Sequence, residues 1–396
     1  MDSEAEIMVG CSGFSYDHWK ESSEEAGDRF APPSKLFPAD LHKTSWLRFY
    51  SHRLATVEIN SSFYGFPKPE TLRKWQSVVA PGFSIVMKCP KSITHEKRLE
   101  AAKGAPQELL RFIHLCVENL QSSLGAILVQ LPPSLARSDA KLRAIFDALR
   151  ACDDMTGAGH ARLLAFEFRH ASWDCDEVRT LVGDMGACVV QTITPEDNAL
   201  KPNFSLSKLS PVELGSFAYI RCGHSVKMEK DIGVTIYGAC EAAGKTESTA
   251  IKAVAQEVRK HLLDKKRCFV FMMNDLGCWA PEDAMLVSHH IEDVCSVEEN
   301  FFKELQLKRE NFADRGLAWR RMSKEDALAR CRVSKSSSSP KRRRPWSEGS
   351  KVTEPERKIT SFFSKGPPSP STSTLTSKKN KSAMDRLREQ QKTYFS

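Results

Sequence analysis

The sequence lacks the features of membrane and secreted proteins. It contains no uncharged apolar run of about 18 residues, the length that a membrane-spanning helix needs. Its start, MDSEAEIMVG, has neither the basic residues nor the apolar centre of a signal peptide. The twelve cysteines occur singly, without a CxxC pair, so a small disulfide framework and a zinc ribbon are both disfavoured. We therefore expect a soluble protein that is not secreted and whose thiols lie mostly buried in a reducing compartment.

Most of the chain lacks a net positive charge. The formal net charge is +8, but residues 332–396 alone hold sixteen Lys and Arg against five Asp and Glu, which leaves 42 against 45 in residues 1–331. The basic segment is rich in Ser, Pro and Lys and poor in aliphatic residues, so it cannot bury enough surface to offset the entropy lost on ordering. We predict a globular body followed by a disordered basic tail.

Eight short apolar segments of strand type recur along the body. Between most of them lie stretches with helical spacing, such as 106–124 and 140–152. Strands that alternate with helices favour a parallel sheet, and eight strands in about 250 residues favour a closed (β/α)₈ TIM-like barrel of the α/β class. A doubly wound open sheet is the alternative, but the GxGxxG and GxxxxGK[ST] phosphate-binding motifs are missing. The predicted strands are 6–11, 56–60, 84–89, 126–131, 163–168, 187–192, 217–222 and 268–274.

The apolar run LLAFEF at 163–168 ends in charged residues. Alternation along the strand turns Phe166 and Phe168 toward the helices, and Glu167 and Arg169 toward the barrel axis. The same parity predicts inward polar groups near the ends of other strands: Glu58, Asn60, Lys88, Gln130, Arg221 and Asn274. Catalytic groups of such barrels come from the carboxyl ends of several strands. We therefore predict one polar site at the end of the barrel where these strand ends meet, which we call the mouth. A buried Glu–Arg pair that serves packing alone is the alternative.

Successive motifs along residues 8–290 resemble those of the YecE-like family of TIM-type barrels, the domain of unknown function 72. The motifs are GCSGFSYDHW (10–19), TVEINSSFYGFPKPETLRKW (56–75), KCPKSITHEKRL (88–99), LGAILVQLPPSL (124–135), EFRHASW (167–173), YIRC (219–222) and MNDLGCWAPEDA (273–284). The chain departs from the family pattern at VVQT in the sixth strand and RCGHS after the seventh. The resemblance implies a barrel with a polar mouth and adds Tyr64, His95, His170 and Trp173 to the candidates. It indicates where the site lies but not which reaction takes place there.

The candidate groups suit an anionic ligand, because Arg binds phosphate or carboxylate through two hydrogen bonds and Lys supplies a point charge. Proton transfer would fall to a carboxylate or His95. The predicted catalytic residues are Glu58, Lys88, His95, Glu167 and His170. The predicted substrate-binding residues are Asn60, Tyr64, Gln130, Arg169, Trp173, Arg221 and Asn274. A glycosidase that uses the two carboxylates is an alternative.

No cofactor is identified from the sequence. HExxH and HxH spacings are absent, so a divalent metal would have to be held by residues from distant loops without a recognisable ligand motif. At the level of the fold, the family barrel resembles apurinic endonuclease IV and sugar isomerases, which work on phosphate or sugar substrates. This analogy favours a hydrolase of phosphodiester or related bonds.

The tail carries two motifs. A compact basic cluster typical of nuclear import signals is formed by Lys341, Arg342, Arg343 and Arg344. Farther on, ERKITSFFSK (356–365) places Ile359 ahead of Phe362 and Phe363 in the spacing of a PCNA-interacting (PIP) box, with Glu356 where a glutamine is usual. Paired phenylalanines in an aromatic-poor segment indicate a docking anchor. We predict a nuclear location, with an import receptor, the sliding clamp and DNA as partners and no membrane.

These features predict three parts: a barrel at residues 1–295, a helical extension at 296–331 and the disordered tail at 332–396. The function expected is that of a nuclear enzyme acting on a phosphate-bearing substrate, such as DNA in replication or repair, recruited by the sliding clamp. The alternative is a non-catalytic module that binds nucleic acid or a small anion and docks partners through its tail. The weakly acidic body speaks against extended contact with a duplex, which needs clustered Lys and Arg.

Overall fold

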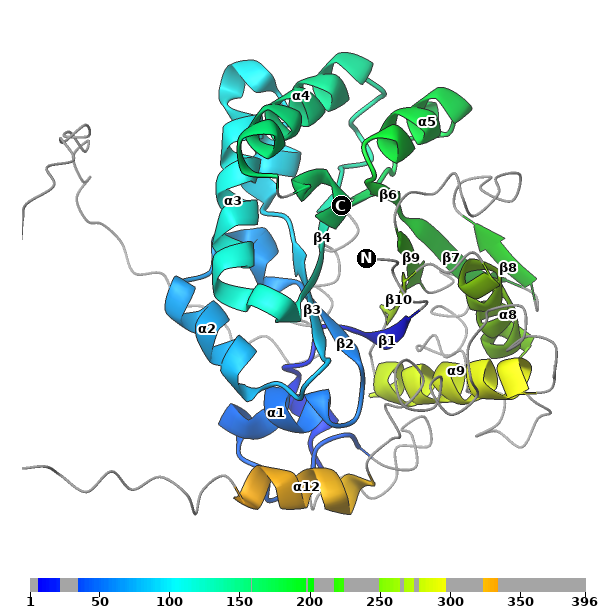
Figure 1. Ribbon diagram of the computed structural model, residues 1–396. Coiled ribbons are helices and arrows are strands. Elements are labelled where there is room, and N and C mark those ends of the chain that lie inside the picture. Colours follow the sequence, from blue (N-terminus) through cyan, green and yellow to red (C-terminus); the bar gives the residue numbers. More distant parts are fainter. Residues whose placement is uncertain are drawn as a thin grey trace, which may run out of the picture. The chain divides into compact units, whose positions relative to one another are not determined.

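The computed structural model describes residues 6–21, 35–157, 159–196, 199–202, 217–223, 249–263, 267–273, 278–296 and 323–333. Within these residues the chain forms a parallel sheet with helices arranged around its outside (Figure 1). Of the helices described, none is both long and apolar enough to span a membrane.

Each of the eight predicted segments forms strand structure, and the predicted α/β TIM-like fold is confirmed. The strands are β1 (Ile7–Ser12), β2 (Thr56–Ile59), β3 (Ser84–Lys88), β4 (Leu124–Gln130), β5 (Leu164–Glu167), β6 (Cys188–Val189), β7 (Gln191–Glu196), β9 (Phe217–Cys222) and β10 (Arg267–Met272). They pair in the order β6-β5-β4-β3-β2-β1-β10-β9-β7, all parallel. Neighbouring strands approach closely, since a Cβ atom at Gly10 would lie 1.8 Å from the carbonyl oxygen of Thr56.

The sixth strand of the barrel is split. Its first half, β6, pairs with β5, while its second half, β7, pairs with β9 at the other end of the sheet. Val190 lies between the halves, and its amide donates to the carbonyl of Phe166 at 2.9 Å. The barrel is therefore closed by the chain itself at Val190. Beyond the barrel, β7 continues into an antiparallel pairing with β8 (Ala199–Pro202).

The helices cover the outer face of the sheet through apolar stripes. They are α1 (Trp46–Ser51), α2 (Pro69–Val78), α3 (Ala105–Leu120), α4 (Asp139–Thr156), α5 (Asp176–Asp184), α8 (Thr249–Leu263) and α9 (Trp279–Ser296). In α3, Leu109, Phe112, Ile113 and Cys116 recur at helical spacing and are buried. Helix α4 ends at Thr156, and the next residue, Gly157, has a φ of 69°, the left-handed conformation that glycine adopts without strain.

The alternation of side chains divides the core into two layers. Inside the barrel, Leu128, Tyr219 and Phe271 belong to one buried cluster, whereas Phe166, Ile220 and Val270 belong to the cluster between sheet and helices. Tyr219 and Ile220 thus face opposite sides of the same strand, as period-two alternation requires. It follows that Arg221, two positions after Tyr219, points into the barrel.

Helix α12 (Lys324–Val333) lies within and just beyond the expected extension at 296–331, and it packs against α1. Arg332 forms an ion pair with Asp40 at 2.5 Å, and Lys324 contacts Glu21. These contacts attach the last described segment to the first third of the chain.

Candidate functional site at the mouth of the barrel

Arg221, at the end of β9, is the centre of a buried charge cluster. Its Nε donates to Oε2 of Glu58 at 3.1 Å and its Nη2 donates to Oε1 of the same carboxylate at 2.9 Å, which makes a forked ion pair. Its Nη1 donates to Oε2 of Glu167. Arg221 and Glu58 are fully buried, and Glu167 nearly so. One guanidinium therefore joins β9 to β2 and β5 across the barrel.

Glu58 receives further hydrogen bonds from residues that sequence reasoning missed. The hydroxyl of Ser12 donates to it at 2.6 Å and that of Tyr219 at 2.7 Å. Burial alone would disfavour the charged form, but Arg221 and Lys88, with these hydrogen bonds, lower the pKa of Glu58. Tyr219 has the same strand parity as Arg221, so alternation could have identified it. Glu58 is thus held as an anion and is a poor proton acceptor.

Glu167 is bound from two sides. The amide of Gln130 donates to its Oε1 at 2.9 Å, and Arg221 binds its other oxygen. Gln130 and Glu167 stand opposite each other in the pairing of β4 with β5. The sequence placed Arg169 as the charge neighbour of Glu167, and the structure adds Arg221, 54 positions away, as a direct partner.

Lys88, the last residue of β3, has an unusual environment. It is almost fully buried, and its Nζ lies 4.7 Å from the centre of the Phe63 ring. Burial and the nearby Arg221 lower its pKa from 10.5 to about 8, although Glu58 and Glu167 act in the opposite direction. A lysine with that pKa exchanges a proton near neutral pH, as an acid–base group must.

His95 lies in the short helix Ser92–Glu96 that follows β3. Its ring meets Phe63 edge-on, with centroids 4.9 Å apart, and Nδ1 is 2.8 Å from the hydroxyl of Thr94. Burial, followed by the charges of Lys88 and Arg169, lowers its pKa to about 4. His95 is therefore neutral at physiological pH and a weak base, whose ring nitrogen can accept a hydrogen bond.

Arg169 and Asn60 complete the cluster that the structure brings together. Burial, assisted by Arg221 and opposed by Glu167, lowers the pKa of the half-buried Arg169. The amide nitrogen of Asn60 donates to the Ser12 hydroxyl at 2.8 Å. Its Oδ1 atom is buried without a hydrogen-bond partner. That oxygen is an acceptor available to a donor group on a ligand.

Other predicted residues have different surroundings. Trp173 is buried, stacks on Phe168 and donates its indole N–H to the carbonyl of Leu135 at 2.7 Å, so its contacts are those of packing. His170 uses Nδ1 to cap the short helix Ala171–Trp173, accepting from the amide of Ser172 at 3.1 Å. Tyr64 is 56% exposed. Asn274 lies outside the described residues, as do all seven predicted tail residues, 341–344, 359, 362 and 363.

The described mouth has ligand-binding groups but no obvious metal centre. Both of its carboxylates are occupied by Arg221, and Lys88 and Arg169 add positive charge beside them. Among the described residues, three metal-ligating side chains come together only in a group outside this mouth. The arrangement is suited to binding an anion and moving a proton.

Fold and site together define a (β/α)₈ barrel protein with a charged cluster at the carboxyl ends of its strands. The chain belongs to the family described as "Protein of unknown function DUF72", which matches residues 8–300. No curated protein gives a significant match.

Two solved structures of DUF72 family proteins are similar to this chain. A DUF72 family protein from Thermotoga maritima is 22% identical, with a TM-score of 0.51, and the match covers 72% of this chain and 99% of that one. A DUF72 family protein from Enterococcus faecalis is 20% identical, with a TM-score of 0.46 over 64% of this chain and 95% of that one. At this identity the first likeness supports the barrel fold alone.

Proposed function

We propose that the protein is a nuclear enzyme that binds a phosphate-bearing substrate, DNA in replication or repair, at the barrel mouth and hydrolyses a phosphodiester or related bond. The observation that carries the proposal is the electrostatics of Lys88, His95 and Arg169. The pKa of each is lowered by burial and by positive neighbours. Two of these groups, Lys88 and Arg169, are cations, and cations held together in a poorly hydrated site gain most from an anion placed between them.

The chemical roles follow from how each group is held. Arg221 forms ion pairs with Glu58 and Glu167 and holds these side chains in position. Lys88 and Arg169 would bind the phosphate oxygens. Lys88 would transfer the proton, because its pKa of about 8 lies close to neutral pH. Neutral His95 would accept a hydrogen bond beside it.

The free acceptor on Asn60 and the exposed ring of Tyr64 suit the remainder of a nucleotide. The buried Oδ1 of Asn60 would accept from a sugar hydroxyl or a base amino group. Tyr64, at the end of the short helix Ser61–Tyr64, would stack on a base or sugar. A substrate with an anion, a hydrogen-bond donor and a flat face matches all of these groups.

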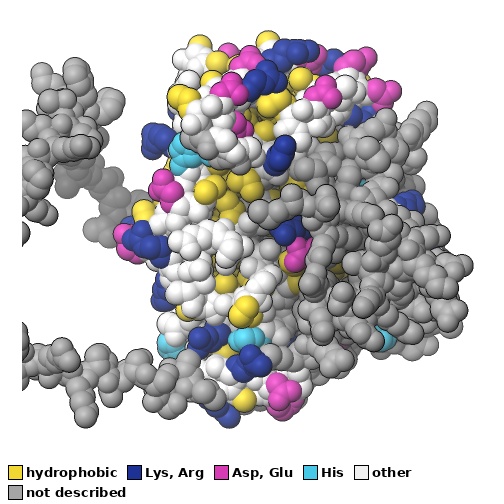
Figure 2. All heavy atoms as spheres, in the orientation of Figure 1, with side chains coloured by type: hydrophobic (Ala, Val, Ile, Leu, Met, Phe, Trp, Pro, Cys, Tyr) yellow, Lys and Arg dark blue, Asp and Glu magenta, His cyan; other side chains and the backbone are white. Residues whose placement is uncertain are grey.

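Contact with a longer stretch of DNA would come from the tail. Over α4 and α5, Figure 2 shows basic and acidic side chains mixed along the same edge, whereas duplex binding needs clustered cations. The basic residues 332–396 would supply that charge. In the same proposal, Lys341–Arg344 direct nuclear import, and Ile359, Phe362 and Phe363 dock on the sliding clamp.

One observation favours the second candidate, a non-catalytic module that binds an anion or nucleic acid. Both mouth carboxylates are already bound by Arg221, and Glu58 is saturated with donors. Such a site can bind an anion, but neither carboxylate is available to act as a general base.

The test is turnover of DNA. The full chain is incubated with labelled oligonucleotides that are intact, nicked or abasic, and products are resolved by length. Lys88→Met should abolish cleavage, whereas Lys91→Met, which removes a neighbouring exposed lysine, should not. Tight binding that depends on Lys88 but yields no product would establish the module instead of the enzyme. Cleavage that survives Lys88→Met would contradict the proposed role of the mouth.

A further inference from the structure

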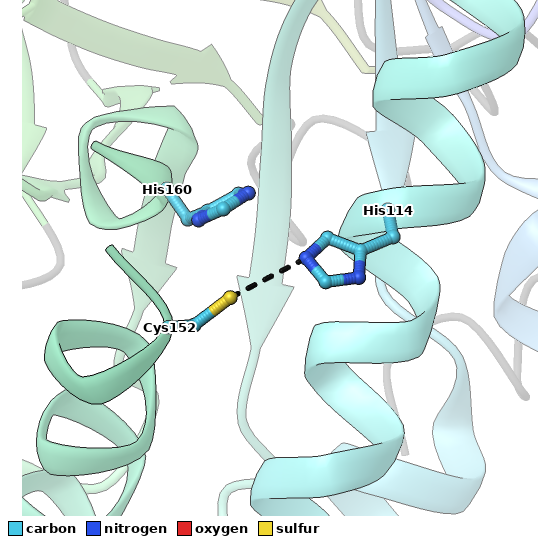
Figure 3. A group of neighbouring side chains, drawn as sticks. All are labelled: His114, Cys152 and His160. Atoms are coloured by element: carbon cyan, nitrogen blue, oxygen red, sulfur yellow. Dashed lines mark hydrogen bonds between the residues drawn. The ribbon is translucent and has the colours of Figure 1, made fainter. Parts of the chain in front are cut away.

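Three side chains that the proposed function does not use converge outside the barrel. His114 comes from α3, Cys152 from α4, and His160 begins the short helix His160–Leu163 that leads into β5 (Figure 3). One ligand atom from each lies within 4.8 Å of the others. Cys152 and His160 are buried and His114 is partly exposed. The three residues form no short sequence motif, because they lie in three separate elements.

The turn that brings His160 to Cys152 depends on two glycines. Gly157 and Gly159 have φ values of 69° and 66°, in the left-handed region that side chains disfavour. They reverse the chain directly after α4. The two glycines therefore allow the chain to turn back after α4, so that the imidazole of His160 lies close to Cys152.

His160 is oriented by a carboxylate. Asp153 contacts its Nδ1, and the same carboxylate accepts from the backbone amide of His160 at 2.9 and 3.0 Å. This leaves Nε2 of His160 as the free ring nitrogen. A histidine whose other nitrogen is bound by a carboxylate is the usual arrangement of a metal ligand.

The separation between the ligand atoms of His114 and Cys152 fits a tetrahedral ion. Nε2 of His114 lies 3.5 Å from Sγ of Cys152. A zinc ion with Zn–S of about 2.3 Å and Zn–N of about 2.0–2.1 Å separates two tetrahedral ligands by about 3.5 Å. We propose that His114, Cys152 and His160 bind Zn²⁺, with Asp153 as the positioning residue and the fourth ligand coming from solvent on the His114 side.

The site belongs to the opposite end of the barrel from the mouth. His160 precedes the first residue of β5, whereas Glu167 is the last residue of that strand. Bound metal would tie α3, α4 and the start of β5 together, so it would stabilise the fold without entering the chemistry of the mouth. Thiolate and imidazole ligands select zinc over magnesium or calcium.

Cobalt provides a spectroscopic test on the full chain. After removal of bound metal with a chelator, Co²⁺ should give the strong visible bands of a tetrahedral site and a sulfur-to-cobalt charge-transfer band, both lost on addition of Zn²⁺. Cys152→Ala and His114→Gln should lose these bands. Cys175→Ala and His289→Gln, which alter a partly exposed thiol and an exposed imidazole elsewhere, should keep them. Asp153→Asn should weaken Co²⁺ binding by about 10- to 100-fold.

The melting temperature of the wild type should also rise with Zn²⁺ and that of Cys152→Ala should not. His114→Gln keeps the test valid if a buried substitution impairs folding, because His114 is partly exposed. Weak octahedral bands in the wild type, or tetrahedral bands with sulfur charge transfer that persist in both Cys152→Ala and His114→Gln, would overturn the proposal.

Discussion

Arg221 binds Glu58 through two parallel hydrogen bonds, of 3.1 and 2.9 Å, although the residues lie 163 positions apart in the chain. The pair connects β9 to β2 inside the barrel, and both side chains are fully buried. Burial of a charge is costly unless a partner compensates it. The cluster at the mouth therefore depends on this pair before any ligand binds.

Replacing Arg221 with Met should destabilise the fold by about 3–5 kcal/mol, because Glu58 and Glu167 would stay buried without their shared cation. Arg221→Lys should recover only part of this loss, since an ammonium cannot form the fork. Urea unfolding followed by circular dichroism measures both values. Lys91→Met, at an exposed ion pair, is the control and should change stability little. Equal stability of Arg221→Met and the wild type would show that the pair is not needed.

Stability should depend on the titration of Lys88. Its pKa of about 8 in the folded chain lies below the 10.5 of an exposed lysine. Between these two pH values the unfolded chain binds more protons, so the free energy of unfolding contributed by Lys88 increases as pH rises, by about 3 kcal/mol in total. Below about pH 8 this gain is absent.

The measurement is the difference in unfolding free energy between the wild type and Lys88→Met from pH 7 to pH 10.5. That difference should grow in favour of the wild type as pH rises. Taking the difference removes the contribution of other groups that ionise in this range. Lys91→Met should follow the wild-type profile. Parallel profiles for the wild type and Lys88→Met would refute the depressed pKa.

A peptide of residues 353–367 should bind the sliding clamp with Phe362 and Phe363 as anchors. Truncation of either to Ala should cost about 2 kcal/mol of binding free energy, the range of interface hot spots. Isothermal titration calorimetry measures this, with Ser361→Ala as the matched control. Undiminished binding by the peptide with both Phe362→Ala and Phe363→Ala would show that these residues are not the anchors.

Nuclear accumulation should require the basic cluster Lys341–Arg344. Alanine at all four positions should move a tagged full chain out of the nucleus, because the cluster provides the positive surface that an import receptor recognises. Imaging in cells measures the distribution. Alanine at Lys378, Lys379 and Lys381, another basic stretch of the tail, should leave it unchanged. Retention in the nucleus without the first cluster would contradict its role.

The strands were predictable because each is a short buried run whose alternation appears in the sequence. The break at Val190 was not, since nothing in the segment ACVVQT marks an interruption and the change of partner from β5 to β9 depends on closure of the barrel. The inward direction of Glu58, Lys88, Gln130, Glu167 and Arg221 also followed from alternation. Their catalytic and binding roles are still predictions.

Specific partners were beyond sequence reasoning. Parity gives the direction of Glu167 but not its contact with Arg221, which depends on how two distant strands curve toward each other. Trp173 follows a polar strand end, and its contacts with Phe168 and Leu135 could not be derived from the sequence. Its substrate-binding role is still a prediction. His114, Cys152 and His160 gave no signal in the sequence, because the proposed ligands come from three elements and have no fixed spacing.

The most direct test of the central claim, that the mouth binds an anion through Lys88, is the titration of that lysine by NMR with and without sulfate. Sulfate represents a phosphate group and does not itself titrate near pH 8. Lysine labelled with ¹³C at Cε gives the pKa, and the signal missing from Lys88→Met identifies the residue.

We predict a pKa of about 8 for Lys88 without sulfate. Saturating sulfate should raise it by about 1–3, because a nearby opposite charge favours the protonated form. Arg169→Met should weaken this effect, and Lys91 should show none of it. A Lys88 pKa that stays the same at every sulfate concentration would contradict the claim that the mouth is an anion site.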